Sequence, residues 1–171
     1  MKRSDLNSNE YNPYYDTYIS KSGTQDLNEL LGSNHIKFID FFESIPIDKH
    51  EFRYEEGKWT IKEIIQHLID TERVFAYRAL CIARQDRTLF PGFDQDAYVL
   101  SCDANSRTMT ELISEYKALR ITTIIMFNSF SDEMLLEVGI ASNSNLSVRA
   151  AGFIIIGHEN HHSQVIKERY L

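Results

Sequence analysis

Apolar residues recur every three or four positions in four long segments of the chain, at residues 26–45, 61–84, 107–130 and 148–170. A repeat close to 3.6 residues is typical of amphipathic α-helices, and no segment shows the strict alternation of a half-buried strand. Four such helices can bury their apolar faces against one another around one core. The pattern therefore predicts an all-α protein with the architecture of an up-and-down four-helix bundle.

Polar residues mark where two of these helices begin. Thr60 is placed to accept a hydrogen bond from the first amides of the second helix, and Glu63, three residues later, completes a capping box. Ser147 is placed to cap the last helix in the same way. Pro91 and Gly92 interrupt residues 86–96, which are predicted to form a loop.

The segments outside the four helices show no sustained period. Residues 1–24 are rich in Asn, Ser and Tyr, and we expect an extended N-terminal arm whose tyrosines pack onto the body of the protein. Residues 132–147 mix a short apolar piece with a polar run and are predicted to be a connector. The chain is thus interpreted as an arm over residues 1–24 followed by one bundle domain over residues 25–171.

Charge and composition narrow the classes of partner. The chain has 171 residues, with 18 Lys and Arg against 25 Asp and Glu, and its net charge of −7 disfavours nucleic acid and anionic membranes. The longest apolar stretch, residues 150–157, is shorter than the roughly 18 residues of a membrane span. The first residues carry no secretory signal pattern. We therefore expect a cytoplasmic protein in which Cys81 and Cys102 stay reduced.

Two histidines of the last predicted helix point into the core. Each helical residue advances by about 100°, which places His158 and His162 near the middle of the apolar stripe and His161 at its edge. Buried imidazoles need partners, and a metal ion is one economical partner for a pair four residues apart. His67, on the flank of the apolar face of the second helix, is the candidate third ligand. Three imidazoles favour Zn, Ni or Fe over Mg or Ca, although hydrogen-bonded core histidines without a metal remain the alternative.

Three stretches of the sequence resemble the DinB-like superfamily, at residues 58–80, 90–96 and 157–171. They include Trp59-Thr60-Ile61-Lys62-Glu63, the loop Phe90-Pro91-Gly92-Phe93-Asp94, and the ending Gly157-His158-Glu159-Asn160-His161-His162. The resemblance covers nearly the whole chain from about Asp26. It implies a four-helix bundle of the DinB-like type.

Members of that superfamily are often dimeric and carry a metal triad with one histidine on the second helix and an HxxxH motif on the fourth. By motif these ligands are His67, His158 and His162. The resemblance also implies a small-molecule substrate and, for some members, transfer of a low-molecular-weight thiol, although family membership fixes a site better than a substrate. We expect a homodimer on the same basis.

Two carboxylates near the predicted site are secondary candidates. Glu72 falls on the apolar face of the second helix, where it would orient water on the metal, hold a histidine ring, or pair with an arginine such as Arg149 or Arg169. Asp70 lies one turn from His67 and would bond its free ring nitrogen. The loop at Phe93 and Asp94 is a candidate cover for the mouth of the site.

Two functions from different classes fit these residues. The first is an enzyme in which the three histidines hold a divalent metal that activates a thiol, as in a thiol S-transferase, or water, as in a hydrolase. The second is a non-catalytic bundle in which the metal only ties helices together or the core binds a ligand. An open coordination position favours the enzyme, and a fourth protein ligand favours the structural role.

Overall fold

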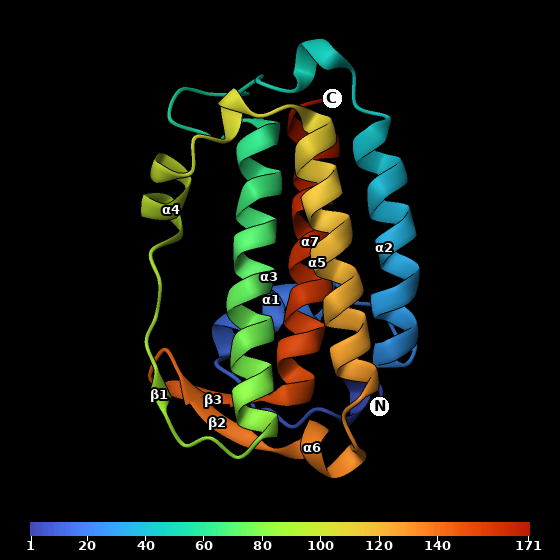
Figure 1. The fold of residues 1–171 in the computed structure, drawn as a ribbon, viewed down its shortest axis with the longest axis vertical. Coiled ribbons are helices and arrows are strands. Elements are labelled where there is room, and N and C mark those ends of the chain that lie inside the picture. Colours follow the sequence, from blue (N-terminus) through green and yellow to red (C-terminus); the bar gives the residue numbers. More distant parts are fainter.

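A computed structural model describes all 171 residues, and four long helices form its framework (Figure 1). They lie close to the predicted segments, at α2 (Leu27–Glu43), α3 (Ile61–Ala83), α5 (Met109–Asn128) and α7 (Val148–Arg169). The predicted capping box of α3 is present: the Glu63 amide donates to Thr60 Oγ1 over 3.1 Å, and the Thr60 amide donates to Glu63 Oε2 over 2.7 Å. Ser147 caps α7 by accepting from the Ala150 amide.

The order of the helices differs from the predicted up-and-down bundle. Helix α3 packs between α5 and α7, and α2 packs on their other side, so the consecutive helices α2 and α3 are diagonal partners. Helices α3 and α5 run in the same direction, because Thr60 and Lys62 at the start of α3 bond to Asn105, just before α5. Helix α7 runs antiparallel to α3, since the Tyr170 hydroxyl donates to the Trp59 carbonyl.

A long crossover makes this order possible. Residues 84–108 leave the end of α3, form β1 (Leu89–Phe90), and return along the side of the bundle through α4 (Gln95–Ser101) to the end where α3 began (Figure 1). Hydrophobic periodicity predicts which segments are helical. It does not indicate whether the next helix runs antiparallel after a short turn or parallel after a long crossover. Predicting a loop at residues 86–96 therefore leaves the order of the helices undetermined.

The predicted helical fold holds for most of the chain, but a small three-stranded sheet is also present, so the protein is not strictly all-α. Strands β2 (Val138–Ala141) and β3 (Ser144–Ser147) form an antiparallel hairpin, and β1 pairs in parallel with β2. Ser142 and Asn143 at the turn have φ of 52° and 61°, the left-handed conformation that a two-residue hairpin turn requires. The segment was interpreted as a connector because its strands are four residues long and the turn lacks the usual glycine.

Short helical segments organise the remaining chain. They are Arg3–Asp5, Pro13–Tyr15, α1 (Asp16–Ile19), Ile47–Lys49, Ala104–Ser106 and α6 (Asp132–Leu136). Helix α1 packs directly on α7. The Tyr15 ring meets Phe75 of α3 edge-on at 5.6 Å, and the Tyr18 ring meets His158 of α7 at 4.9 Å between centroids. Part of the tyrosine-rich segment is thus helical and lies against the core.

The buried core consists of two apolar clusters. One is built around the start of α7 and the last turns of α3, and the other around the first half of α3 and the end of α7. Between them, polar side chains from all four long helices are buried, including Asn34 of α2, Glu72 of α3, Arg120 of α5 and His158 of α7. These four side chains, together with Glu159 of α7, are called the polar layer below. No helix is long and apolar enough to cross a membrane.

Gly157 is required for the contact between α1 and α7. A Cβ atom at this position would lie 1.9 Å from the Tyr18 carbonyl oxygen, so α1 could not keep its place against the helix. We predict that Gly157→Ala lowers the free energy of unfolding by about 1–3 kcal/mol, as measured by denaturant titration. The matched control is Gly32→Ala in α2, where a Cβ meets nothing within 4 Å and should stabilise the helix by up to about 1 kcal/mol. Equal effects at the two positions would contradict this account.

Candidate metal centre

Three histidine nitrogens from two helices converge inside the bundle. His67 Nε2 lies 3.0 Å from His158 Nε2, which lies 3.1 Å from His162 Nε2. One nitrogen from each ring can be chosen so that all three lie within 4.8 Å of one another. The antiparallel packing of α3 on α7 brings His67 to the other two, which stand one turn apart on α7 and so share a face.

Burial keeps these histidines neutral. His67 and His158 are 3% and 5% exposed, and His162 is partly buried. Desolvation lowers the pKa of His67 to about 4. Desolvation, followed by repulsion from the neighbouring imidazoles, holds the pKa values of His158 and His162 well below the usual histidine value. All three rings therefore present neutral nitrogens at physiological pH, the form that binds a metal.

Aromatic side chains hold the three rings in place. Trp59, at the start of α3, lies 4.7 Å from the His67 ring and 6.4 Å from the His162 ring, which it stacks against at 23°. Tyr18 contacts His158 on its other side. Trp59 therefore forms one wall of the histidine cluster.

The chemistry of the donors fits a divalent transition metal. A neutral imidazole carries one N–H and one lone pair. When the three nitrogens face one another, hydrogen bonds among them cannot satisfy every donor and acceptor. No carboxylate, thiol or fourth histidine joins the group. Ligand atoms about 2.0–2.1 Å from a tetrahedral metal lie roughly 3.3 Å apart, close to the two shorter separations between these nitrogens.

The other three histidines lie outside the cluster. His161 is half-buried beside Tyr18, with ring centroids 5.3 Å apart, and it belongs to no group that could hold a metal. His35 stacks on Tyr116, and His50 Nε2 contacts the Ile45 carbonyl. The helical wheel, which placed His161 at the edge of the apolar stripe, agrees with this arrangement.

The two carboxylates proposed from sequence do not contact the histidines. Asp70 accepts a hydrogen bond from Gln66 over 3.0 Å and lies near Arg73. Glu72 forms a buried ion pair, which was one of the alternatives considered, but its partner is Arg120 rather than Arg149 or Arg169. Arg149 instead pairs with Glu10.

Arg120 and Glu159 form the part of the polar layer that sequence reasoning missed. Arg120 Nε donates to both Glu72 oxygens over 3.0 and 3.1 Å, and its Nη2 bonds to Glu72 and to Glu159, the residue after His158. Burial alone would lower the pKa of Arg120, but the two carboxylates raise it well above its usual value. Burial raises the pKa of Glu159. The Glu72–Arg120–Glu159 group lies beside His158, with which it lines a small internal cavity.

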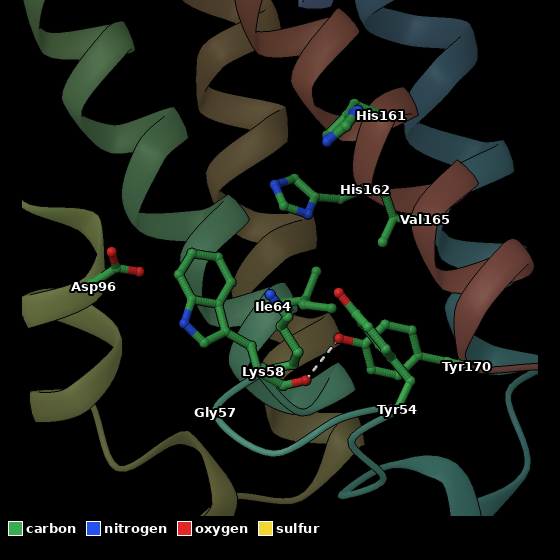
Figure 2. Close-up of a pocket in the computed structure, with 10 residues that line it drawn as sticks. Tyr54, Gly57, Lys58, Ile64, Asp96, His161, His162, Val165 and Tyr170 are labelled. Carbon is green, nitrogen blue, oxygen red and sulfur yellow. Dashed lines mark hydrogen bonds between the residues drawn. The ribbon is translucent and has the colours of Figure 1, made fainter.

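One cavity reaches the cluster from the end of the bundle where α3 begins. It has a volume of about 350 Å³ and exposes His162, with His161 beside it on the same helix (Figure 2). Tyr54, Gly57 and Lys58 on the loop before α3 form its lower rim, and Asp96 of α4 lies across from them. A second cavity, of about 360 Å³, reaches His158 from the side covered by α1. Both contain space for a small molecule.

The loop at residues 90–96 contributes to both cavities. Phe93 lines the second cavity and Asp96 the first. Asp94, which was considered as part of a cover, instead caps α4 by accepting from the amides of Asp96 and Ala97. The sequence thus indicates the right loop, but within it Phe93 lines a cavity whereas Asp94 only caps α4.

The buried ion pairs make Arg120 essential for stability. We predict that Arg120→Met costs about 3–5 kcal/mol, because it leaves two buried carboxylates without a counter-charge. Thermal unfolding would measure the loss, and adding Glu72→Gln should recover part of it. The control is Lys117→Met, which breaks the exposed Lys117–Glu43 pair and should cost less than about 1 kcal/mol. A small effect at Arg120 would show that the charges are solvated in solution.

The lowered histidine pKa values predict acid sensitivity of the metal-free protein. The unfolded chain takes up protons near the ordinary histidine pKa of about 6.5, whereas folded His67 does so only near 4. Stability should therefore fall as the pH drops from about 6.5 towards 4, by up to about 3 kcal/mol for His67 alone. Denaturant titrations at neutral pH and at about pH 4.5 would measure this, with His67→Gln losing less than the parent protein. An unchanged pH dependence in His67→Gln would refute the assignment.

Comparisons with known proteins agree with this structure. A protein of Oceanobacillus iheyensis, provisionally named a metal-dependent hydrolase, is 26% identical over 116 residues. The match covers 67% of this chain and 66% of that relative, so this chain spans just under two thirds of the relative's length. YfiT from Bacillus subtilis, described as a probable metal-dependent hydrolase with an unusual four-helix bundle topology, superimposes with a TM-score of 0.73 at 14% identity, over 96% of this chain and 90% of YfiT. The DinB superfamily profile matches residues 35–166, and the chain belongs to that superfamily.

Proposed function

We propose that this protein is a metal-dependent enzyme in which His67, His158 and His162 bind one divalent transition-metal ion, with Zn, Ni or Fe as the candidates. The observation that supports the proposal is the convergence of three neutral imidazole nitrogens with no fourth protein donor beside them. Three protein ligands are typical of catalytic sites, where a further position takes water or substrate, whereas structural zinc sites are closed by a fourth ligand.

The reaction that fits best is activation of a small nucleophile at this centre. A divalent metal lowers the pKa of bound water or thiol and so supplies a nucleophile at neutral pH. The names of the two relatives favour hydrolysis, and transfer of a low-molecular-weight thiol is the alternative within the same site. Neither cysteine is placed as a protein nucleophile, because Cys102 bonds to the Val99 carbonyl and Cys81 lies outside both cavities.

The side chains around the centre have distinct tasks in this proposal. The three histidines hold the ion without neutralising its charge, and the Glu72–Arg120–Glu159 group beside His158 fixes how α3, α5 and α7 pack around the centre. Trp59 fixes two of the rings, and the cavities admit a small-molecule substrate. We further propose that the protein acts in the cytoplasm, where its two free cysteines stay reduced, and forms a homodimer.

Metal content of single variants tests the ligand assignment. We predict about one metal ion per chain in the untagged protein, and its loss in His158→Ala or His162→Ala, because two imidazoles bind far more weakly than three. His161→Ala is the matched control, since it removes the adjacent histidine and should keep the metal. Elemental analysis would measure both. Retention of metal in His162→Ala together with its loss in His161→Ala would reverse the assignment.

A chelator titration separates the enzyme from the structural alternative. If the metal only tied α3 to α7, its binding free energy would be folding free energy, and the metal-free protein would unfold. The buried apolar clusters on both sides of the polar layer predict instead that the metal-free bundle stays folded. Collapse of the fold on chelation, without any reaction of the loaded protein, would support the structural role.

An assay panel identifies the nucleophile. Loaded protein would be tested for hydrolysis of small esters and amides, and for the loss of free thiols in the presence of an alkylating electrophile. Activity should rise with pH as the bound water or thiol ionises, and it should be absent in His158→Ala. Turnover in the ester assays alone would establish the hydrolase, and thiol-dependent turnover would establish the transferase.

A further inference from the structure

The second cavity has a composition that the metal site does not explain. It lies between α1, α3, α7 and the loop before α4, and it is called the tyrosine cavity here. Its lining residues are Tyr14, Tyr15, Tyr18, Thr71, Phe75, Gly92, Phe93, Gln95, Ser142, Ile154 and His158. One lining residue is therefore a candidate metal ligand, and half of the other ten are aromatic.

The aromatic walls are suited to a flat apolar group. Tyr15 packs edge-on against Phe75 at 5.6 Å and against Tyr14 at 5.3 Å, so the rings hold one another at fixed angles. Tyr14 is 63% exposed and stands at the mouth of the cavity. A planar group that enters between such rings gains both burial and ring–ring contacts.

Arg78 is a buried charge at the edge of this cavity without a carboxylate partner. Three arginines are buried in the protein, and Arg120 and Arg149 each pair with glutamate. Arg78 is 3% exposed, but none of the ion pairs includes it. Its Nη2 donates to the Pro91 carbonyl over 2.6 Å and to Ser142 Oγ over 3.5 Å, and the Tyr15 side chain is a further neutral partner. An isolated buried charge is costly unless it is paired.

Arg78 does not itself line the cavity, but it packs against three residues that do, Phe75, Phe93 and Ser142. Its guanidinium carbon lies 5.3 Å from the centre of the Phe75 ring and 5.8 Å from that of Phe93, and both rings line the cavity. Ser142, its third neighbour, is also a lining residue. An anionic group bound at this edge would supply the counter-charge that the chain itself does not provide.

Thr71 is an unpartnered hydroxyl at the other end of the cavity. The side chain is 5% exposed, and its Oγ1 has no hydrogen-bond partner. It stands one helical turn after His67 on α3 and lines the cavity together with His158. A buried hydroxyl without a partner loses about 1–3 kcal/mol of solvation, which a polar ligand atom would restore.

We propose that the tyrosine cavity binds a small organic acid with a planar apolar body, whose carboxylate pairs with Arg78 and whose polar reactive end bonds to Thr71 beside His158. The assignment of a reactive end rests on the proposed metal-dependent function. Binding of the acid itself does not depend on the metal, because Arg78, Thr71 and the aromatic rings all belong to the chain.

Binding of phenylacetate to the metal-free protein tests this inference. Phenylacetate carries the planar ring and the carboxylate, 2-phenylethanol lacks the charge, and acetate lacks the ring. Calorimetry or NMR titration should show saturable binding of phenylacetate and at least about tenfold weaker binding of the other two. Absence of phenylacetate binding at millimolar concentration would overturn the proposal.

Two variants and one control locate the binding. Arg78→Met keeps the aliphatic bulk and should weaken phenylacetate binding about tenfold or more, without the fall in melting temperature expected for Arg120→Met. Thr71→Val, which replaces the unpartnered hydroxyl by a methyl group, should fold normally. It should weaken binding of 4-hydroxyphenylacetate, whose hydroxyl stands for the polar reactive end, about threefold or more, and leave phenylacetate binding unchanged, because phenylacetate has no polar atom for Thr71. Lys58→Met, a change of charge in the other cavity, should leave phenylacetate binding unchanged. Equal phenylacetate affinity in the parent and Arg78→Met proteins, or equal 4-hydroxyphenylacetate affinity in the parent and Thr71→Val proteins, would refute the site.

The same titration separates failure of this inference from failure of the proposed function. Phenylacetate binding that persists in His67→Ala, without metal, supports the cavity even if no reaction is ever found. Stoichiometric metal binding without phenylacetate binding in the metal-free protein overturns the cavity and leaves the metal site standing. Binding that requires zinc and is insensitive to Arg78→Met would place the carboxylate on the metal, which also overturns the proposal.

Discussion

The burial of charged and polar side chains in one layer across the bundle is the constraint on which the rest of the structure depends. Arg120 is 1% exposed, and Glu72 and Glu159 are 3% exposed, so each depends on the others for its hydrogen bonds and its counter-charge. These residues come from α5, α3 and α7. Because the loss of one partner leaves a buried charge, the layer fixes how the three helices sit relative to one another. The histidine nitrogens meet at a defined point as a result.

Features that depend on residues close together in the sequence could be predicted, whereas features that depend on contacts between distant helices could not. The capping box at Thr60 and Glu63 and the helix of residues 61–83 follow from neighbours in sequence, and both were predicted. The convergence of His158 and His162 follows from the period of a single helix. The role of Arg120 depends on two other helices, so no local pattern indicates it. Glu159 falls at about 20° on the wheel of α7, beside Ile166 at the edge of the core stripe, but its pairing with Arg120 also depends on another helix. The order of the helices depends on the crossover, which periodicity does not describe.

The two ends of the histidine cluster differ in chemical character. His162 lines a cavity with Lys58 and Asp96, whereas His158 lines a cavity with aromatic rings and the unpartnered hydroxyl of Thr71. A centre with a polar approach on one side and an aromatic approach on the other can receive two different reactants without forcing them through one opening.

The parallel arrangement of α3 and α5 has a consequence for how the protein folds. The His67–His158 contact joins residues 91 positions apart, because the chain must complete the crossover, α5 and the hairpin before α7 can pack on α3. Contacts of such long sequence separation slow folding, since loop-closure entropy is lost before the contact is gained. Compared with a bundle whose successive helices are neighbours, this chain should collapse more slowly and form its histidine cluster late. A metal present during folding would then bind only to molecules in which α3 and α7 have already packed together.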